Sequence, residues 1–427
     1  MTKEYKNPET IGLHAGWRKD ETTNSVAVPI HQTSSYQFDN TDHAANLFSL
    51  SELGNIYSRI MNPTNAVLEE RIATLEGGVG ALGVASGQAA SSYSIQNIAK
   101  AGDNIVASAH LYGGTYNQFK NPFKDMGIEV RFVDPENPQN FKDATDENTR
   151  AYYGEVLPNP SFKVFPIEEV AELGKPLGIP LIVDNTAAPI ICKPFDHGAT
   201  ALIHSTTKYM TGNGTVTGGC VVDSGKFDWS ANDKFPSLSQ QEPAYHGLRF
   251  HETFGALAFT FHGIAVGLRD LGMTMNPQAA HYTLMGLETL SLRMQRHVDN
   301  AIKIANWLEE QHAIEKVTYA GLTSSPYFER VKEICPRGAG GLFTIALKGG
   351  YESCIKFVDA LEIFSHVANL GDTRSLVIHS ASTTHRQLTQ EQQVAAGAAP
   401  NVVRISIGIE DADDLIADLK QALSAAK

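Results

Sequence analysis

A lysine set among small hydroxyl and glycine residues is the first candidate for chemistry in this sequence. Lys208 follows Ser205, Thr206 and Thr207 and precedes a glycine-rich run, in ALIHSTTKYMTGNGTVTGG at residues 201–219. One interpretation is a solvated lysine in a polar loop. The other is a buried amine, because burial disfavours the charged form of a lysine and makes the neutral form available as a nucleophile or a base.

Two common nucleotide-binding patterns are excluded for this run. It contains no G-x-x-x-x-G-K-[ST] phosphate loop, and Thr217 stands where a dinucleotide fingerprint that includes Gly212 and Gly214 requires a third glycine. A second residue favours the buried interpretation of Lys208. Asp184 ends IPLIVD, the most strand-like segment of the chain, upstream of the lysine.

An acid at a strand end and a lysine further along the chain are the two groups that a pyridoxal 5'-phosphate ring requires. The lysine amine forms a Schiff base with the aldehyde of the cofactor. The carboxylate keeps the ring nitrogen protonated, so that the ring withdraws electrons. Asp184 and Lys208 together therefore predict a pyridoxal 5'-phosphate site.

The segment SxTK with DNT upstream resembles the cofactor site of the Cys/Met-metabolism family of pyridoxal-phosphate enzymes. Further segments match that family in its order: YSRIMNPT (57–64), ASGQAA (85–90), LYGGT (111–115), PNP (158–160) and RISIGIE (404–410). The resemblance covers nearly the whole chain. It implies an α/β protein of the aspartate-aminotransferase-like class, fold type I, with a mostly parallel sheet domain and a smaller C-terminal α/β domain.

The resemblance implies donors for the cofactor phosphate, which is a dianion. Ser86, Gly87 and Gln88 lie at a predicted strand-to-helix turn, where backbone N–H groups and the helix N-terminus would face the phosphate. Ser205 and Thr207 would add hydroxyl donors from the same side of an extended segment. A polar strand end is the alternative interpretation of these two residues.

The resemblance also implies that the site is shared between subunits. Tyr57 and Arg59 match the residues that reach the phosphate of a neighbouring subunit, with Tyr57 also near the substrate, although a surface charge before a helix is the alternative interpretation of Arg59. Residues 1–60 are irregular and polar, which suits an arm that lies on another surface. We therefore expect a homotetramer built as a dimer of dimers.

The remaining matches imply contacts to the cofactor ring and to an amino-acid substrate. Tyr112 resembles the tyrosine that stacks on the ring and helps to move a proton, and Asn159 the residue that hydrogen-bonds the phenolic oxygen. Arg404 resembles the clamp for the substrate α-carboxylate, because a guanidinium binds a carboxylate at two points. Ser375 maps to a second contact near that carboxylate. The methionine γ-lyases of the family tend to carry a cysteine where Gly114 stands here.

Apolar runs and helical patterns predict the elements that position these residues. Gly77-Gly78 ends a predicted helix that begins near Asn62. Strands are predicted at 81–85, 104–109, 128–133, 151–156 and in IPLIVD, with helices between them, which indicates a parallel sheet covered on both faces. Ligands gather at the carboxyl ends of such strands. There the sequence places Ser86, His110, Glu155 and Asp184.

The chain is expected to divide into three parts. Residues 1–60 form the arm, residues 61–275 the large cofactor-binding domain, and residues 276–427 the C-terminal domain. The last part begins with a long helical stretch, MGLETLSLRMQRHVDNAIKIANWLEEQ, and ends in a mixed segment that closes with VVRISIGIE.

Composition and charge limit the class of protein. The chain has 427 residues, 42% of them apolar, and a formal net charge of −13, so neither nucleic acid nor an anionic membrane is an expected partner. The N-terminus lacks an apolar signal segment, and no apolar run approaches the roughly 18 residues of a spanning helix. The four cysteines include no C-x-x-C pair, which is typical of a reduced, cytoplasmic protein.

Two pairs of histidines are the only pattern that suggests a metal. His246 and His251, and likewise His379 and His385, have neither the i, i+4 spacing of helical ligands nor an H-E-x-x-H motif. We therefore predict no metal site.

The family eliminates or replaces groups at the β or γ carbon of amino acids. Which of these reactions is expected here depends on two further segments of the sequence. A long insertion at 229–277, with EPAYHG, and the segment 369–388, with Gly371-Asp372, resemble the O-acetylhomoserine sulfhydrylases of this family; Ser380 stands where that group has proline. The expected activity is a transferase reaction, the γ-replacement of O-acetyl-L-homoserine by sulfide or methanethiol. Cystathionine γ-synthase or γ-lyase activity is the alternative, and a cofactor-binding protein without turnover is a third interpretation.

Overall fold

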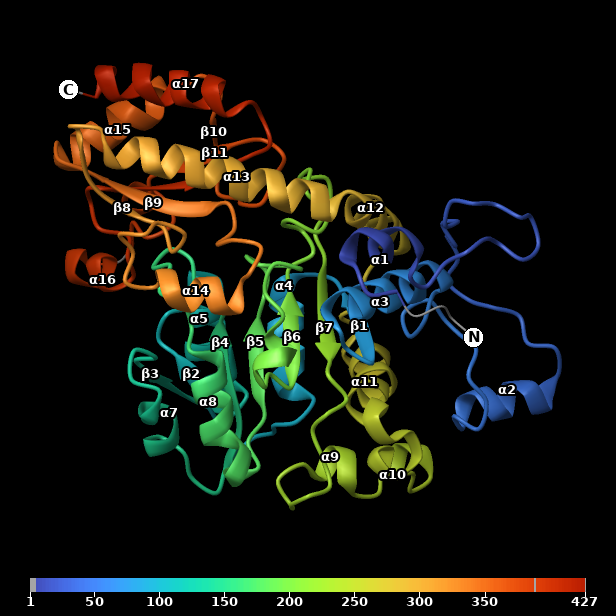
Figure 1. The fold of residues 1–427 in the computed structure, drawn as a ribbon. Coiled ribbons are helices and arrows are strands. Elements are labelled where there is room, and N and C mark those ends of the chain that lie inside the picture. Colours follow the sequence, from blue (N-terminus) through green and yellow to red (C-terminus); the bar gives the residue numbers. More distant parts are fainter. Residues whose placement is uncertain (1–4, 388, 427) are drawn as a thin grey trace.

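Two β-sheets organise the chain in the computed structural model, which describes residues 5–387 and 389–426. A seven-stranded sheet lies in the larger part of the molecule and a five-stranded sheet in the smaller, C-terminal part (Figure 1). Within the described residues, no helix combines the length and the apolar character needed to cross a bilayer.

The large sheet has the strand order β1-β7-β6-β5-β4-β2-β3. β7 is antiparallel to both neighbours, and the other pairs are parallel. The strands are β1 (Gly80–Val84), β2 (Asn104–Ser108), β3 (Glu129–Val133), β4 (Thr149–Glu155), β5 (Leu181–Asp184), β6 (Ala201–His204) and β7 (Gly219–Asp223). The five strands predicted from apolar runs are confirmed as β1 to β5. β6 and β7, which those runs did not predict, join β5 to β1.

The central strands of this sheet are largely apolar because both of its faces are covered, whereas the edge strand β3 carries Glu129 and Arg131 and is partly exposed. In β5 the side chains of Leu181 and Val183 pack in one hydrophobic cluster, and Ile182 packs in a second. In β4 Tyr152 belongs to the first cluster and Tyr153 to the second. Since successive side chains of a strand point to opposite faces, the continuous apolar runs correspond to burial on two sides.

Helices cover the two faces of the large sheet. The first cluster includes side chains from α3 (Pro63–Glu76), α7 (Gln139–Asp143) and α8 (Ile167–Gly174). The second includes side chains from α4 (Gly87–Gln96), α5 (Gly113–Lys120), α6 (Pro122–Asp125), α9 (Pro236–Ser239), α10 (Phe250–Phe254), α11 (Ala258–His262) and the π-helix Gly263–Leu271. The insertion predicted at 229–277 therefore folds as short helices against the second face.

The helix predicted from Asn62 to Gly77 is confirmed as α3. The Asn62 side chain accepts a hydrogen bond from the Thr64 N–H at 2.9 Å, and Pro63 occupies the first turn. Gly77 ends the helix with φ 81°, a left-handed conformation that favours glycine. Sequence-local signals thus set both ends of this helix.

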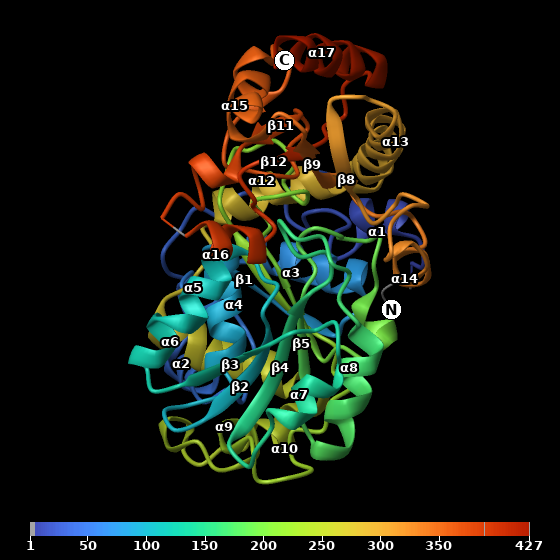
Figure 2. The same ribbon diagram turned by 90° about the vertical axis from the view of Figure 1, so that its left-hand side faces the viewer.

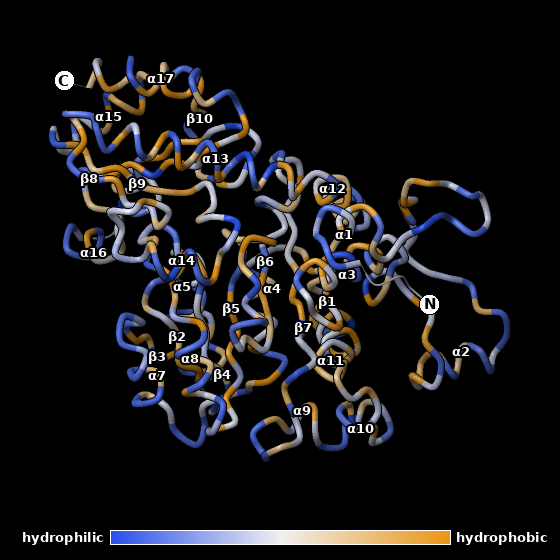
Figure 3. Tube along the Cα trace, in the orientation of Figure 1, coloured by the Kyte–Doolittle hydropathy of each residue, from blue (hydrophilic) through white to orange (hydrophobic). Residues whose placement is uncertain are grey.

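The N-terminal segment leaves the body of the molecule. It contains α1 (Pro8–His14), which packs against α3, α12 and α13, and then long loops and α2 (Thr41–Phe48), which stand apart in Figure 1. Apolar stretches lie along these loops (Figure 3), and the side chains of Val26, Phe48 and Leu53 are 82%, 61% and 60% exposed. Contact of this arm with a neighbouring subunit stays a prediction.

The C-terminal sheet has the order β10-β11-β12-β9-β8, with only β10 and β11 parallel. Its strands are β8 (Ile314–Thr318), β9 (Leu342–Leu347), β10 (Ser365–His366), β11 (Leu376–Ile378) and β12 (Val402–Ser406). The helices of this part are α12 (Pro277–Glu288), α13 (Leu290–Glu309), α14 (Phe328–Ile334), α15 (Gly350–Ala360), α16 (Gln390–Ala395) and α17 (Ala412–Ala425). Figures 1 and 2 both place α15 and α17 at the end of the molecule opposite α9 and α10.

The helical stretch that opens this part is two helices rather than one. α12 ends at Glu288 and α13 begins at Leu290, and Thr289 between them has φ −113° and ψ 6°. The two sheets share one core, because the first cluster runs from Leu202 and Val222 of the large sheet to Ile345 and Val403 of the small one. The division of the chain at residues 60 and 275 stays a prediction.

Candidate active site

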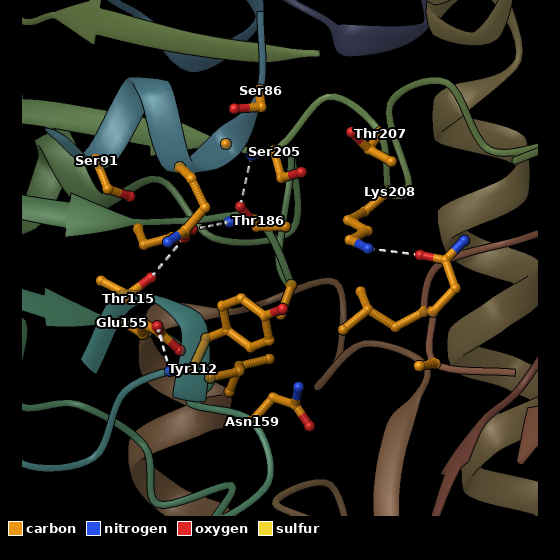
Figure 4. Close-up of a pocket in the computed structure, with 18 of the residues that line it drawn as sticks. Ser86, Ser91, Tyr112, Thr115, Glu155, Asn159, Thr186, Ser205, Thr207 and Lys208 are labelled. Carbon is orange, nitrogen blue, oxygen red and sulfur yellow. Dashed lines mark hydrogen bonds between the residues drawn. The ribbon is translucent and has the colours of Figure 1, made fainter. Parts of the chain in front are cut away.

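A cavity of about 250 Å³ lies where the carboxyl ends of β4, β5 and β6 meet the N-terminus of α4 (Figure 4). The C-terminal part contributes residues 368–370 and Arg404 to its wall. Most of the predicted site residues meet there: Ser86, Gly87, Gln88, Tyr112, Asn159, Asp184, Ser205, Thr207, Lys208 and Arg404. The residues brought together come from positions spread over most of the sequence.

The N-terminus of α4 forms one end of the cavity. The Ser86 side chain caps the helix by accepting the Ala89 N–H at 3.1 Å. Gly87 and Gln88 are the first helical residues, so their N–H groups have no carbonyl partner within the helix and can bind an anion. A Cβ on Gly87 would lie 2.6 Å from the Ser205 Cβ, so glycine is required for this close approach.

Residues 205–208 form a turn at the end of β6, and the prediction of an extended segment there is wrong. The Lys208 N–H donates to the Ser205 carbonyl at 3.2 Å, and the Gly212 N–H donates to the Lys208 carbonyl at 2.8 Å. The Thr207 hydroxyl donates to the Gly218 carbonyl at 3.2 Å and accepts the Gly218 N–H at 3.0 Å. The chain turns because it must reverse to enter the antiparallel β7, yet Ser205 and Thr207 both still line the cavity.

Lys208 is partly buried on the cavity wall, which excludes the solvated-loop interpretation. Its Nζ donates a hydrogen bond to Asn369 Oδ1 at 2.5 Å (Figure 4). Burial, and then the positive charge of Arg404, lower the pKa of Lys208 to about 8. A neutral amine is therefore more accessible near neutral pH than it is on an ordinary lysine.

Asp184 ends β5 across the cavity from Lys208. Its carboxylate accepts the Thr186 N–H at 2.8 Å, and the Thr186 hydroxyl accepts the Ser205 N–H at 2.8 Å, which links the turns after β5 and β6. Burial raises the pKa of Asp184 to about 6. The ionised form of a buried carboxyl group is stabilised by a positive charge beside it. A protonated ring nitrogen provides such a charge.

Arg404 reaches the cavity from the centre of the small sheet, on β12. Its Nη2 donates to the Asn369 carbonyl at 2.7 Å, and its Nη1 donates to Asn159 Oδ1 at 3.4 Å. Its Nε is buried and has no hydrogen-bond partner among the described residues. Burial lowers the pKa of Arg404 to about 10. Because this value is still above neutral pH, the guanidinium stays charged, and its Nε remains as a donor for an anionic ligand.

Tyr112 stands at the start of α5 with half of its side chain exposed. Its N–H donates to Glu155 Oε1 at 2.6 Å. Glu155 is buried at the end of β4, opposite Asp184 in the register of β4 and β5. Sequence reasoning placed Glu155 at a strand end and gave it no role. Asn369 was also missed, although it opens the NLGDTRS segment that had been singled out.

Two residues that the sequence directed to this part of the molecule, Ser375 and His110, are absent from the described cavity wall. The Ser375 hydroxyl donates to Glu410 Oε2 at 2.9 Å and accepts the Gly408 N–H at 2.8 Å, which engages it away from the cavity. Tyr57 and Arg59 are also absent from the cavity wall of their own chain, and their assignment to the site of a neighbouring subunit stays a prediction. The Arg59 guanidinium carbon lies 5.4 Å from the centre of the Tyr57 ring, so these two side chains stay together on the N-terminal segment.

Two of the histidines considered for a metal, His379 and His251, contact other groups of the protein. His379 Nε2 pairs with the Pro400 carbonyl at 2.9 Å, and His251 Nε2 lies 3.6 Å from Asp228 Oδ1. In the part of the chain that the structure describes, no three or more His, Cys, Asp or Glu side chains are grouped to hold a metal ion.

The donor set of the cavity fits pyridoxal 5'-phosphate (PLP). Free N–H groups at the start of α4 suit its phosphate, the Asp184 carboxyl suits its ring nitrogen, and the Lys208 amine suits its aldehyde. The unmet Nε of Arg404 leaves a further donor for the carboxylate of an amino acid. These groups lie in one cavity, and the start of α4 and the end of β5 are the elements that the sequence predicted for the phosphate donors and for Asp184.

Comparisons with known proteins agree with this site. The model of the Cys/Met metabolism PLP-dependent enzyme family matches residues 9–424. The chain is 48% identical to the O-acetyl-L-homoserine sulfhydrylase of Leptospira meyeri, over 99% of this chain and 98% of that one. It is 46% identical to the homocysteine synthase of Schizosaccharomyces pombe, over the full length of both.

A solved structure is similar over the same length. The putative O-acetylhomoserine (thiol)-lyase of Campylobacter jejuni, crystallised with N'-pyridoxyl-lysine-5'-monophosphate, gives a TM-score of 0.95 at 40% identity, over 98% of this chain and 100% of that one. The fold type I prediction is thereby confirmed. The chain belongs to the Cys/Met metabolism family of PLP-dependent enzymes.

Proposed function

We propose that the protein catalyses the γ-replacement of O-acetyl-L-homoserine by sulfide or methanethiol. The products are L-homocysteine or L-methionine, and acetate. The observation that carries the proposal is the juxtaposition in one cavity of Lys208, Asp184 and Arg404, whose Nε has no hydrogen-bond partner among the described residues. Similarity over the whole chain to O-acetyl-L-homoserine sulfhydrylases supports this choice of substrate within the family.

Different residues of the cavity are assigned to different parts of the cofactor and the substrate. PLP, when bound, supplies an electron-withdrawing ring that stabilises negative charge on the attached amino acid. The start of α4, with Ser205 and Thr207, would hold the phosphate, and Asp184 would keep the ring nitrogen protonated. Tyr112 would contact the ring, and Asn159 would bind its phenolic oxygen. Arg404 would bind the α-carboxylate and so orient the amino acid.

Lys208 moves the protons. Its amine would take a proton first from Cα and then from Cβ of the substrate, and the electron pair left at Cβ would expel acetate from Cγ. Sulfide or a thiol would then add at Cγ. The amine would return a proton to each of the other two carbons after the new bond at Cγ has formed. A pKa of about 8 suits this role, because an amine near the working pH both accepts and donates a proton readily. Asn369 Oδ1 holds the amine at the cavity wall when it is not covalently engaged.

The neighbouring subunit is part of this proposal. Tyr57 and Arg59 complete the phosphate site of another copy in a homotetramer built from dimers. The exposed apolar side chains of Val26, Phe48 and Leu53 on the same segment support burial of the arm against a second chain. A cytoplasmic location also belongs to the proposal and agrees with four buried, unpaired cysteines.

An assay of the purified holoenzyme with two esters and three nucleophiles tests the proposal. O-acetyl- and O-succinyl-L-homoserine are each offered with sulfide, methanethiol or L-cysteine, and the amino-acid products are identified by mass. We expect homocysteine from the acetyl ester and sulfide to form fastest. Cystathionine from L-cysteine as the dominant product would instead assign a cystathionine γ-synthase. Cofactor binding without any turnover would overturn the proposal.

A further inference from the structure

Tyr112 is positioned through its backbone as well as by the contact of its ring with Gly114. The side chain is 50% exposed, and the two residues that follow it are Gly113 and Gly114, which restrict the chain little. The Tyr112 carbonyl accepts the Tyr116 N–H at 2.9 Å within α5, and what ties this point to the large sheet is the hydrogen bond from the Tyr112 N–H to Glu155 Oε1, at 2.6 Å. It joins the start of α5 to the end of β4.

The ring of Tyr112 lies over a residue without a side chain. A Cβ built on Gly114 would stand 2.5 Å from Cε1 of the Tyr112 ring, closer than two carbons approach. The conformation of Tyr112 therefore depends on the bare Gly114 below the ring and on the acceptor that Glu155 provides at the main chain.

Glu155 is placed to hold more than one wall of the cavity. Its side chain is only 6% exposed, and it is the last residue of strand β4. Backbone hydrogen bonds from Tyr112 and from Asn159 both lower the pKa of Glu155, while burial and the negative charge of Asp184 raise it by more. The N-terminus of α5 adds a favourable field for negative charge at the same place. One buried carboxyl group thus interacts with the backbone of two separate segments of the cavity wall.

We propose that Glu155 is a positioning residue whose carboxyl group fixes the Tyr112 ring against the bound cofactor. The inference rests on the proposed function, since it assigns Tyr112 a place in that site. A short N–H to carboxyl hydrogen bond, accepted by a side chain that is itself buried, can hold a main-chain conformation that a half-exposed ring does not fix alone.

Two substitutions separate the reach of the Glu155 acceptor oxygen from the ability of the carboxyl group to ionise. Glu155→Asp keeps the carboxyl but withdraws it by one methylene, so the Tyr112 N–H loses its acceptor. Glu155→Gln keeps an acceptor oxygen at the original reach and cannot ionise. We expect the visible circular dichroism of the bound cofactor, measured without substrate, to fall at least twofold in the Asp variant and to stay within a quarter of the wild-type signal in the Gln variant.

Kinetics in a second background show whether Glu155 acts through Tyr112. We expect Glu155→Asp to lower kcat/KM for the ester by about tenfold in the wild-type chain. In a Tyr112→Ala chain the same change should cost less than twofold, because the ring to be positioned is gone. Equal losses in the two backgrounds would show that Glu155 acts on another group and would overturn the proposal.

Asp223 provides the matched control. It is also a buried carboxyl that accepts a backbone N–H, from Gly225 at 2.9 Å, and burial raises its pKa to about 6. It ends the antiparallel strand β7, at the other end of the sheet from the cavity. Asp223→Asn should leave the dichroism and kcat/KM within twofold of wild type, whatever it does to stability. A loss as large as that of Glu155→Asp would attribute both to general damage and would overturn the proposal.

The dichroism separates this inference from the proposed reaction. It requires bound PLP and no substrate, so it reports on Tyr112 even if the protein does not use O-acetyl-L-homoserine. An unchanged signal in Glu155→Asp would overturn the positioning role while leaving the proposed function intact. Absence of turnover in the wild-type protein would overturn the function alone.

Discussion

Lys208 and Asn369 stand 161 positions apart in the sequence and meet through a 2.5 Å hydrogen bond from Nζ to Oδ1. The main-chain carbonyl of the same asparagine accepts Nη2 of Arg404 at 2.7 Å. One residue of the small sheet's connecting segment thus contacts both the amine that anchors the cofactor and the guanidinium proposed to bind the substrate.

Asn369→Asp should move the pH dependence of Lys208 upward. An opposite charge beside the amine favours its protonated form, so the pKa rises above about 8. Since only the neutral amine attacks an aldehyde, the rate at which cofactor-free protein takes up PLP should rise through a midpoint at higher pH than in wild type. Asn369→Ala is the control, because it removes the acceptor without adding charge. An unchanged midpoint in the Asp variant would contradict the contact.

Asp184→Asn should weaken cofactor binding and slow the chemistry together. Loss of one partner of a buried charge pair costs roughly 3–5 kcal/mol, about two to three and a half decades in rate if all of it falls on the transition state. In the wild-type protein, cofactor affinity should also decline as pH falls through about 6, because the carboxylate is then protonated. Titration of PLP absorbance against pH measures both effects. A change below about threefold in affinity and rate would remove Asp184 as the ring partner.

Arg404→Lys should separate substrate binding from cofactor assembly. Lysine keeps the charge but loses the planar two-point contact, so kcat/KM for the ester should fall by roughly two decades, about 2–3 kcal/mol. PLP absorbance should not change. Arg374→Lys is the control, because Arg374 pairs with Asp372 at 2.9 Å outside the described cavity wall. Loss of PLP with normal use of the ester would place Arg404 in the phosphate site instead.

Gly114→Ala should displace the Tyr112 ring, since the added Cβ would lie 2.5 Å from Cε1. We expect PLP to bind and kcat/KM to fall about tenfold, on the scale of a misplaced contact of 1–2 kcal/mol. Gly113→Ala is the matched control, because its Cβ would meet only His385 Nε2 at 3.9 Å, an ordinary contact. Equal activity of the two variants would show that the ring position does not matter.

Mixing two inactive variants tests whether the site is shared between subunits. Lys208→Ala and Arg59→Ala proteins are combined under conditions that exchange subunits, which is verified by mass. Hybrid dimers then contain one site with both defects and one with neither, so activity should return to roughly a quarter of wild type at equal mixing if exchange is random. No rescue despite proven exchange would place Arg59 in the site of its own subunit or outside any site.

Local patterns predicted five strands of the large sheet and the two cofactor-binding residues Asp184 and Lys208. They did not predict the contacts between residues that are distant in the sequence. Asp184 and Lys208 could be identified because a strand end and a lysine in a small-residue run have recognisable surroundings. Glu155 and Asn369 were missed because their partners Tyr112 and Lys208 are 43 and 161 positions away, and no periodicity records such a pairing. The helical pattern likewise continues through Thr289, where the structure begins a new helix.

The turn at 205–208 was predicted as extended for a related reason. An alternation of hydroxyl residues looks the same in a strand and in the tight return that follows one. Here the direction of β7 decides, because an antiparallel neighbour requires the chain to reverse. Tertiary pairing overrode the local preference.

The hydrophobic core shared by the two sheets has a consequence for folding energetics. Because Leu202 and Val222 of the large sheet and Ile345 and Val403 of the small one belong to a single cluster, neither half can lose its partner without exposing apolar surface. Loss of the small sheet is therefore expected to lower the stability of the large one. A ligand that binds the cavity only in the folded state raises the stability of that state by mass action.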